Sequence, residues 1–403
     1  MPAKQGHKGR ATPELPQSHR RSTRTLKLPS DTGLLLFNPV LNRLFAFNES
    51  ARLLWEAIER GSGIDNIASD FVTRYGISFE AARRDVDAMI ENWQALDLLS
   101  GDDCVPSPAP VRAHQVTDWS QASRACWLDT TVYTVRGKVF SLASDASHSP
   151  AMIRSFLRHL ETPKAEPGLR LEVRQTADGS SALLMNGREQ FRTRDGAQLI
   201  GGISQAILEY LHPGVEWLAM MHGGAVMREG VGVVFPATSG SGKTTLIAHL
   251  IAQERFTYLA DDLIALAAPS GHVVPWPMPL SIKQGSWPLL SGSYPGLQNA
   301  PSYETTRGPA RLLVSSSTDW NTDPVLVHRI VFPKYSAGTA AKMNQITAFE
   351  AIERLLGDRI WLGHPMTEPR VTAFLTWLNE TPAYEITYGE LDDGVLLIES
   401  ILG

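Results

Sequence analysis

The chain has 403 residues, of which 43% are hydrophobic and 20% are charged, and its formal net charge is -5 at pH 7. This composition is typical of a folded protein of two or three domains, and the negative balance argues against nucleic acid or an anionic membrane as a partner. With 2 cysteines, a disulfide framework and a cysteine-rich zinc site are excluded, and we expect a cytoplasmic protein. No apolar run reaches membrane-spanning length.

Residues 1–25 are basic and polar and lack the apolar stretch of a secretory signal, so we expect a disordered arm. A compact pattern follows over residues 26–101. Its apolar runs at residues 33–37 and 43–47 flank a polar turn, which predicts a β-hairpin.

Three helical stretches follow the hairpin. The first begins near Asn48 or Ser50 and stops at Gly61, and the second ends at Gly76. Ser78 is suited to cap the third. A hairpin with three short helices predicts a winged-helix-like domain, a class that either reads DNA or binds peptides.

The charges on the third helix favour peptide binding. Arg83 and Arg84 lie among the acids Asp85, Asp87 and Glu91, so the helix lacks the basic face that a DNA groove requires. The hairpin, the segment N-E-S-A-R-L-L-W at 48–55 and the closing L-D-L-L resemble PqqD-like peptide-recognition domains of ribosomal peptide modification systems. This resemblance implies that a precursor's leader peptide is captured as an added strand at the hairpin edge.

The middle of the chain carries no motif of its own. Residues 102–120 are rich in proline and small polar side chains, which predicts a linker. From residue 121 to about 214, short β-type runs alternate with helices near 152–160 and 200–212, without metal-ligand spacing or a catalytic triad pattern. We expect this stretch to be the first layer of the domain that follows rather than a separate unit.

A phosphate-binding loop stands at residues 237–244, which we call the phosphate cradle. Its sequence A-T-S-G-S-G-K-T fits G-x-x-x-x-G-K-[ST] except for Ala237, and it lies between a predicted strand ending at Pro236 and a predicted helix from Thr244 to Gln253. Such a loop turns backbone N–H groups and the positive end of the helix toward phosphate oxygens. We expect the Lys243 ammonium to reach the β- and γ-phosphates rather than a structural partner, and Thr244 to contact Mg²⁺. The predicted nucleotide contacts are Ser239, Gly240, Ser241, Gly242, Lys243, Thr244 and Thr245.

Two adjacent acids follow the next apolar run. Asp261 and Asp262 have apolar residues on both sides, which favours a buried position at a strand end. One carboxylate is then suited to accept a proton from an attacking hydroxyl and the other to hold a metal ion. Which acid has which role stays open, and we place the metal with Thr244 and Asp262.

The motifs together resemble HPr kinase and its relatives. They are H-G at His222, S-G-S-G-K-T in the cradle and L-A-D-D at residues 259–262, within a similarity that runs from about residue 126 to the end. The resemblance implies an α/β domain over residues 121–403 with a mixed β-sheet, on the fold shared with phosphoenolpyruvate carboxykinase. By resemblance, Lys243 and the acids are catalytic and His222 lies near the transferred phosphoryl group, although a structural histidine is an equal alternative.

Three cations complete the predicted site. Lys283 lies in a segment P-L-S-I-K that resembles the P-L-S-x-K of HPr-kinase-related proteins and is a candidate for a second anion contact. Arg307 and Arg311 lie in a predicted loop and are candidates to clamp phosphate or an acidic substrate group, against the alternative of simple surface solvation.

We therefore predict a kinase that uses ATP and Mg²⁺ to phosphorylate a Ser or Thr hydroxyl of a ribosomally made precursor peptide, whose leader the first domain binds. One alternative is a kinase of a small molecule, such as a sugar or nucleoside, with a regulatory first domain. Another is a peptide chaperone that binds ATP without transferring phosphate. The resemblance also allows a homo-oligomer.

Overall fold

A computed structural model of the protein describes most of the chain. The predicted arm (1–25) and linker (102–120) lie outside the described residues, as does Arg307. The described chain divides into two compact units, one within residues 1–109 and 363–372 and the other within 110–362 and 373–403. The described residues are 26–28, 33–39, 41–96, 98–99, 129–144, 150–163, 165–176, 178–194, 196–276, 278–305, 308–314, 323–358, 360–363 and 366–402.

The first unit contains the expected hairpin and three helices, preceded by a short strand that the sequence pattern did not reveal. Its strands pair in the antiparallel order β1-β2-β3. In chain order the elements are β1 (Leu26–Leu28), β2 (Leu34–Asn38), β3 (Arg43–Phe47), α1 (Glu49–Glu59), α2 (Ile64–Tyr75) and α3 (Phe79–Ala95).

The helix boundaries in this unit follow from local capping, as predicted. The Asn48 side chain accepts a hydrogen bond from the N–H of Ala51 at 3.0 Å and starts α1. Ser78 does the same for Ala81 at 3.2 Å and starts α3. Gly76 ends α2 with a φ of 65°, which suits glycine best.

An aromatic cluster holds the hairpin to the helices. Phe47 of β3 stacks on Trp93 of α3 with ring centroids 4.7 Å apart. Trp55 of α1 meets both rings edge-on, at 5.8 and 5.5 Å, and all three side chains are buried. Burial of such large apolar surfaces is the main stabilising term in a small domain.

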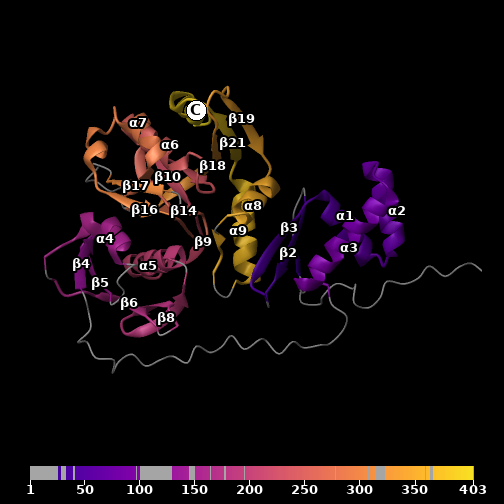
Figure 1. Ribbon diagram of the computed structural model, residues 1–403, viewed down its shortest axis with the longest axis horizontal. Helices are drawn as coiled ribbons and strands as arrows, with labels where there is room; N and C mark the ends of the chain where they lie inside the picture. The colour runs from indigo at the N-terminus through magenta and orange to yellow at the C-terminus, as the bar shows by residue number, and fades with distance from the viewer. Residues whose placement is uncertain are drawn as a thin grey trace, which may run out of the picture. The chain divides into compact units, whose positions relative to one another are not determined.

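The second unit begins with a sheet of its own. Its five described strands pair in the order β4-β5-β6-β7-β8, with α5 beside β7 and β8 (Figure 1, magenta). The stretch from residue 121 to about 214 therefore has its own sheet but belongs to the same compact unit as the phosphate cradle. The last strand of this sheet, β8, was not predicted. The elements are β4 (Asp129–Val135), β5 (Lys138–Ser144), α4 (Pro150–Leu157), β6 (Leu169–Gln175), β7 (Ser181–Met185), β8 (Arg188–Thr193) and α5 (Gly196–Leu211).

A mixed sheet of ten described strands forms the centre of the second unit. Its path is β12-β10-β11-β18-β14-β13-β9-β20, and β21 pairs with β18 and β19. The strands are β9 (Trp217–Met221), β10 (Gly223–Arg228), β11 (Val231–Pro236), β12 (Thr257–Ala260), β13 (Ile264–Ala267), β14 (His272–Val274), β18 (Val325–Tyr335), β19 (Lys342–Ile346), β20 (Ile360–Trp361) and β21 (Ala383–Tyr388).

This sheet curls back on itself. Strands β9 and β10 lie near opposite ends of the strand path, yet a single residue, His222, joins them in the chain. The curl brings the ends of β9, β11 and β12 into one region. A third sheet of the second unit, β15-β17-β16, contains β15 (Leu280–Lys283), β16 (Ser302–Thr305) and β17 (Gly308–Leu313).

Helices complete the second unit. Helix α6 packs against β10, and its Leu246 and Ile247 are fully buried. The helices after α5 are α6 (Lys243–Ala252), α7 (Trp287–Leu290), α8 (Ala348–Leu356), α9 (Glu368–Glu380) and α10 (Leu391–Ser400). The division between the units falls within α9, whose residues up to Thr372 belong to the first unit. In the described chain, no helix combines the length and the apolar character that a bilayer crossing needs. The fold is thus mixed α/β and multidomain, as predicted.

Candidate active site

The predicted phosphate cradle is a tight loop between β11 and α6. Gly240 and Gly242 have φ angles of 99° and 93°, a region that favours glycine. A Cβ on Gly242 would lie 2.7 Å from the Cβ of Tyr335, so the loop also needs glycine for space. The N–H of Tyr335 donates to the Ser241 carbonyl at 2.9 Å and ties the loop to the end of β18. Helix α6 begins at Lys243, directly after Gly242.

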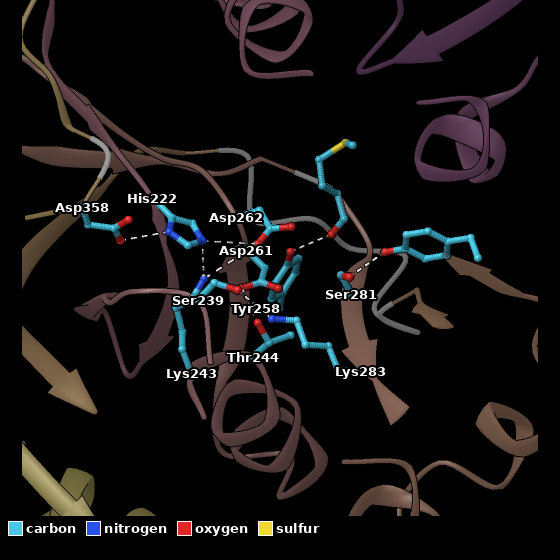
Figure 2. Close-up of polar contacts among 12 residues, drawn as sticks. His222, Ser239, Lys243, Thr244, Tyr258, Asp261, Asp262, Ser281, Lys283 and Asp358 are labelled. Atoms are coloured by element: carbon cyan, nitrogen blue, oxygen red, sulfur yellow. Dashed lines mark hydrogen bonds and ion pairs between the residues drawn. The ribbon is translucent and has the colours of Figure 1, made fainter. Parts of the chain in front are cut away.

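Lys243 is buried among ionisable side chains (Figure 2). Its side chain is 4% exposed, and its Nζ lies 3.3 Å from His222 Nε2. The same atom lies 3.7 Å from Asp261 Oδ1 and 3.8 Å from Asp262 Oδ1. The expectation that this ammonium lacks a structural partner is therefore wrong. A buried cation requires counter-charges, and the two acids supply them.

The backbone explains how two consecutive acids face one cation. Strand β12 ends at Ala260, and Asp262 has a φ of 62°, in the left-handed region. Successive side chains of a strand point to opposite faces, and this turn removes the alternation. Gly224 of β10 packs closely here, because a Cβ on it would lie 3.0 Å from Asp261 Oδ1.

Asp261 combines burial with one unsatisfied oxygen. Its Oδ1 accepts a hydrogen bond from the Thr244 hydroxyl at 3.3 Å, whereas its buried Oδ2 has no hydrogen-bond partner among the described residues. Burial raises the pKa of this carboxyl to about 6, although Lys243 opposes the shift. A carboxylate beside a hydroxyl is the kind of oxygen pair that Mg²⁺ uses next to phosphates, so these residues fit the ion. The described side chains contain no cluster of three or more His, Cys, Asp or Glu placed to hold a metal ion.

Asp262 differs in exposure and in charge. Its side chain is 52% exposed, to the interior of a deep cavity. The surrounding protein favours the neutral form, but His222, which lies 3.8 Å away, and the charges of Lys243 and Lys283 outweigh that effect. They lower the pKa of Asp262 to about 2, so the carboxylate is ionised at neutral pH.

His222 is oriented by an acid that the sequence did not reveal. Its Nδ1 lies 2.9 Å from Asp358 Oδ2, and its Nε2 faces Lys243 and lies 3.8 Å from Asp262 (Figure 2). Because a carboxylate accepts hydrogen bonds, Nδ1 carries the proton. Asp358 follows α8, and 136 positions separate it from His222. No local motif marks it, and only the folded chain brings the two together.

The three other predicted cations have different positions. Lys283 Nζ donates to the hydroxyl of Ser239 at 2.7 Å, which places this lysine at the phosphate cradle. Arg311 is held elsewhere: its guanidinium lies 3.8 Å from the centre of the Trp287 ring, and it donates to the Leu297 carbonyl at 3.0 Å. Arg311 therefore does not line the site. Arg307 lies outside the described residues.

The groups of the candidate site line one cavity of about 1080 Å³. At one end it is lined by the cradle and by the residue that follows it, Thr245, whose hydroxyl lies 2.6 Å from that of Ser286. His222, Asp358 and both site acids also line it. Small-molecule sites usually enclose about 300–1,000 Å³, so this cavity has room for more than one ligand. Beyond the acids its lining is largely apolar.

Comparison with known families gives a match in the first unit. The model of coenzyme PQQ synthesis protein D (PqqD) matches residues 33–99. The prediction of a PqqD-like domain is confirmed, and the match links this part of the chain to peptide recognition in peptide modification. No curated protein matches the chain. The resemblance of the second unit to HPr kinase stays a prediction.

Proposed function

We propose that the protein is an ATP-dependent kinase that phosphorylates a Ser or Thr hydroxyl of a ribosomally made precursor peptide. One observation carries the transfer chemistry: a buried lysine at the start of a helix, beside a glycine loop, within 3.8 Å of two carboxylates in one cavity. The PqqD match supports a peptide as the acceptor. ATP would bind with its phosphates at the cradle, as in other loops of this type.

The two acids are suited to different roles. Asp261 is buried, accepts from Thr244 and has a free oxygen, so we assign Mg²⁺ to Thr244 and Asp261 rather than to Asp262. Asp262 is ionised and accessible from the cavity, which suits it to contact the acceptor hydroxyl. When bound, Mg²⁺ would neutralise charge on the transferred phosphate. This assignment reverses our first placement of the metal with Asp262.

These residues account for the proton and the charge in the transfer step. The oxygen of the acceptor hydroxyl forms a bond to the γ-phosphorus, and Asp262 takes the proton of that hydroxyl. The bond from that phosphorus to the bridging oxygen breaks, and ADP leaves with the electron pair. Lys243 and the backbone amides of the cradle stabilise the negative charge during the step. His222, held by Asp358, keeps Lys243 and Asp262 in place.

Peptide capture is the proposed role of residues 33–99. A module that binds the leader raises the effective concentration of the acceptor at the active site. Such binding adds the same free energy to the ground state and the transition state, so it lowers KM more than it raises kcat.

The test of transfer is the intact mass of a candidate precursor peptide after incubation with the protein, ATP and Mg²⁺. We expect one added phosphoryl group. Asp262→Asn should slow the reaction by about 10²- to 10⁴-fold, the usual contribution of a general base. Asp70→Asn, which neutralises an exposed acid of α2, is the matched control, and with a leaderless acceptor peptide it should react like the wild type. Equal rates in the two variants would contradict the role of Asp262.

A comparison of two peptides tests the capture step. Phosphorylation of a precursor with its leader should show a much lower KM than phosphorylation of the leaderless peptide, at similar kcat. If KM does not depend on the leader, peptide capture by the first unit is excluded, and if neither peptide is phosphorylated, a small-molecule acceptor becomes the better account.

A further inference from the structure

The cavity continues past the acids into a pocket that phosphate transfer does not explain. We call this region the apolar end and define it by six lining residues: Phe156, Met221, Trp276, Met278, Tyr303 and Trp361. They come from α4, β9, β16, β20 and the segment between β14 and β15. The cavity volume of about 1080 Å³ exceeds the usual range for one small molecule, so we expect this end to stay available when the cradle holds a nucleotide.

The apolar end begins directly beside the acids. Met221 immediately precedes His222, and its register partners are Ile264 of β13 and Ile360 of β20. Met278 accepts a hydrogen bond through its carbonyl from the Tyr258 hydroxyl at 2.6 Å. Tyr258 lies on β12, the strand that leads to the acids (Figure 2). A group attached to a hydroxyl at Asp262 is therefore adjacent to this surface.

The walls of the apolar end are held by their own contacts. Phe156 meets the Tyr303 ring edge-on at 5.7 Å, and the Tyr303 hydroxyl shares a hydrogen bond of 2.5 Å with Ser281. Trp276 is 1% exposed, so it is fixed in the protein interior. A pocket whose walls are already ordered costs little rearrangement when it is filled.

Charge at the two ends of the cavity differs. The lysines that line the cavity are Lys243 and Lys283, and both lie at the cradle. The acids at the boundary of the apolar end would repel an acidic group, and the six defining residues offer no cation to a carboxylate. The lining thus disfavours both an acidic neighbour and a free carboxyl terminus close to the acceptor hydroxyl.

We propose that the apolar end binds a large apolar or aromatic side chain that flanks the phosphorylated Ser or Thr of the acceptor peptide. This inference rests on the proposed kinase function and adds the local sequence that the enzyme selects. Burial of one such side chain would favour its peptide over an alanine-flanked peptide by about tenfold to a hundredfold in kcat/KM.

Three short peptides test the proposal with the full-length protein, ATP and Mg²⁺. Each is acetylated and amidated and carries one Ser, flanked on both sides by Phe, by Ala or by Asp. The expected order of kcat/KM is Phe, then Ala, then Asp. Equal rates for the three peptides would overturn the selective pocket and leave the kinase function intact. Failure to phosphorylate any of them, together with failure on the precursor, would overturn the kinase function itself.

Variants of the pocket wall locate the selectivity. Phe156→Ala should reduce the ratio of Phe-peptide to Ala-peptide kcat/KM toward one, and Phe156→Leu should retain part of it. Because both peptides are measured with one preparation, a loss of folded protein cancels in the ratio. Leu396→Ala, which removes an apolar side chain that is 62% exposed on α10, is the control and should keep the wild-type ratio. A wild-type ratio in both Phe156 variants would contradict the proposed site.

Discussion

The PqqD-like domain and the cavity of the second unit use buried space in opposite ways. In the first unit the interior is apolar around Trp55, and charged groups pair outside, as Arg83 does with Asp65 at 2.7 Å. In the second unit a lysine and a carboxylate, Lys243 and Asp261, are buried together. Exposed ion pairs contribute little to stability, whereas buried charges lower it unless they are paired well. The first arrangement stabilises a fold, and the second holds charges in place for chemistry.

The largest effect that separates the two regions is expected at Lys243. Lys243→Met removes the cation and keeps the length of the side chain, so phosphoryl transfer should fall by about 10³-fold or more. The two acids would then lie together without the buried ammonium that faces both of them, and the melting temperature should fall as well. Single-turnover phosphorylation and thermal unfolding measure the two effects. A normal melting temperature would show that the carboxylates do not depend on the lysine.

In the first unit the corresponding change is Trp55→Ala. This side chain is 0% exposed and contacts Phe47 and Trp93, so its loss should lower the free energy of unfolding of this unit by about 3–5 kcal/mol. Chemical denaturation followed by tryptophan fluorescence measures the change. Phosphorylation of a leaderless peptide should persist, and its loss would show that transfer depends on the first unit.

Removal of the buried acid Asp261 should raise stability, whereas the changes at Lys243 and Trp55 lower it. The pKa of Asp261 is about 6 when folded and near 3.8 when unfolded, so between these values the unfolded state loses its proton first. The free energy of unfolding therefore falls as pH rises through this window, by at most about 3 kcal/mol. Asp261→Asn should remove this loss and raise the melting temperature near neutral pH, while transfer fails.

Thermal unfolding of the wild type and Asp261→Asn at about pH 4 and about pH 7 tests whether the substitution stabilises the protein. The gain in melting temperature should be larger at the higher pH. Asp70→Asn serves again as the exposed control and should change stability by less than about 0.5 kcal/mol. A destabilised Asp261→Asn protein near neutral pH would contradict the interpretation that this buried charge lowers stability.

The smallest expected effect is at a helix cap of the first unit. Ser78→Ala removes the acceptor for the Ala81 N–H and should lower the free energy of unfolding by about 1 kcal/mol. Ser78→Asp is the matched variant, because an aspartate caps equally well and should restore stability. Denaturant midpoints with unchanged slopes measure the difference, and an equal loss in both variants would exclude the cap as the cause.

Much of the local structure could be predicted from the sequence, because it depends on residues that are neighbours in the chain. Asn48, Gly76 and Ser78 mark helix ends because each acts on backbone within a few residues. The glycines and lysine of the cradle were recognisable for the same reason, since strand, loop and helix are consecutive. The apolar neighbours of the adjacent acids predicted burial correctly for Asp261, whereas Asp262 is 52% exposed.

Only the tertiary structure decided how distant groups meet. The curl of the central sheet brings His222 to Lys243, and Asp358 reaches the histidine from 136 positions away. Arg311 turns to a tryptophan instead of the site, and the pairing of Thr244 with Asp261 distinguishes the two acids. These outcomes depend on strand order and on a single left-handed residue, Asp262, and neither leaves a periodic or local pattern in the sequence.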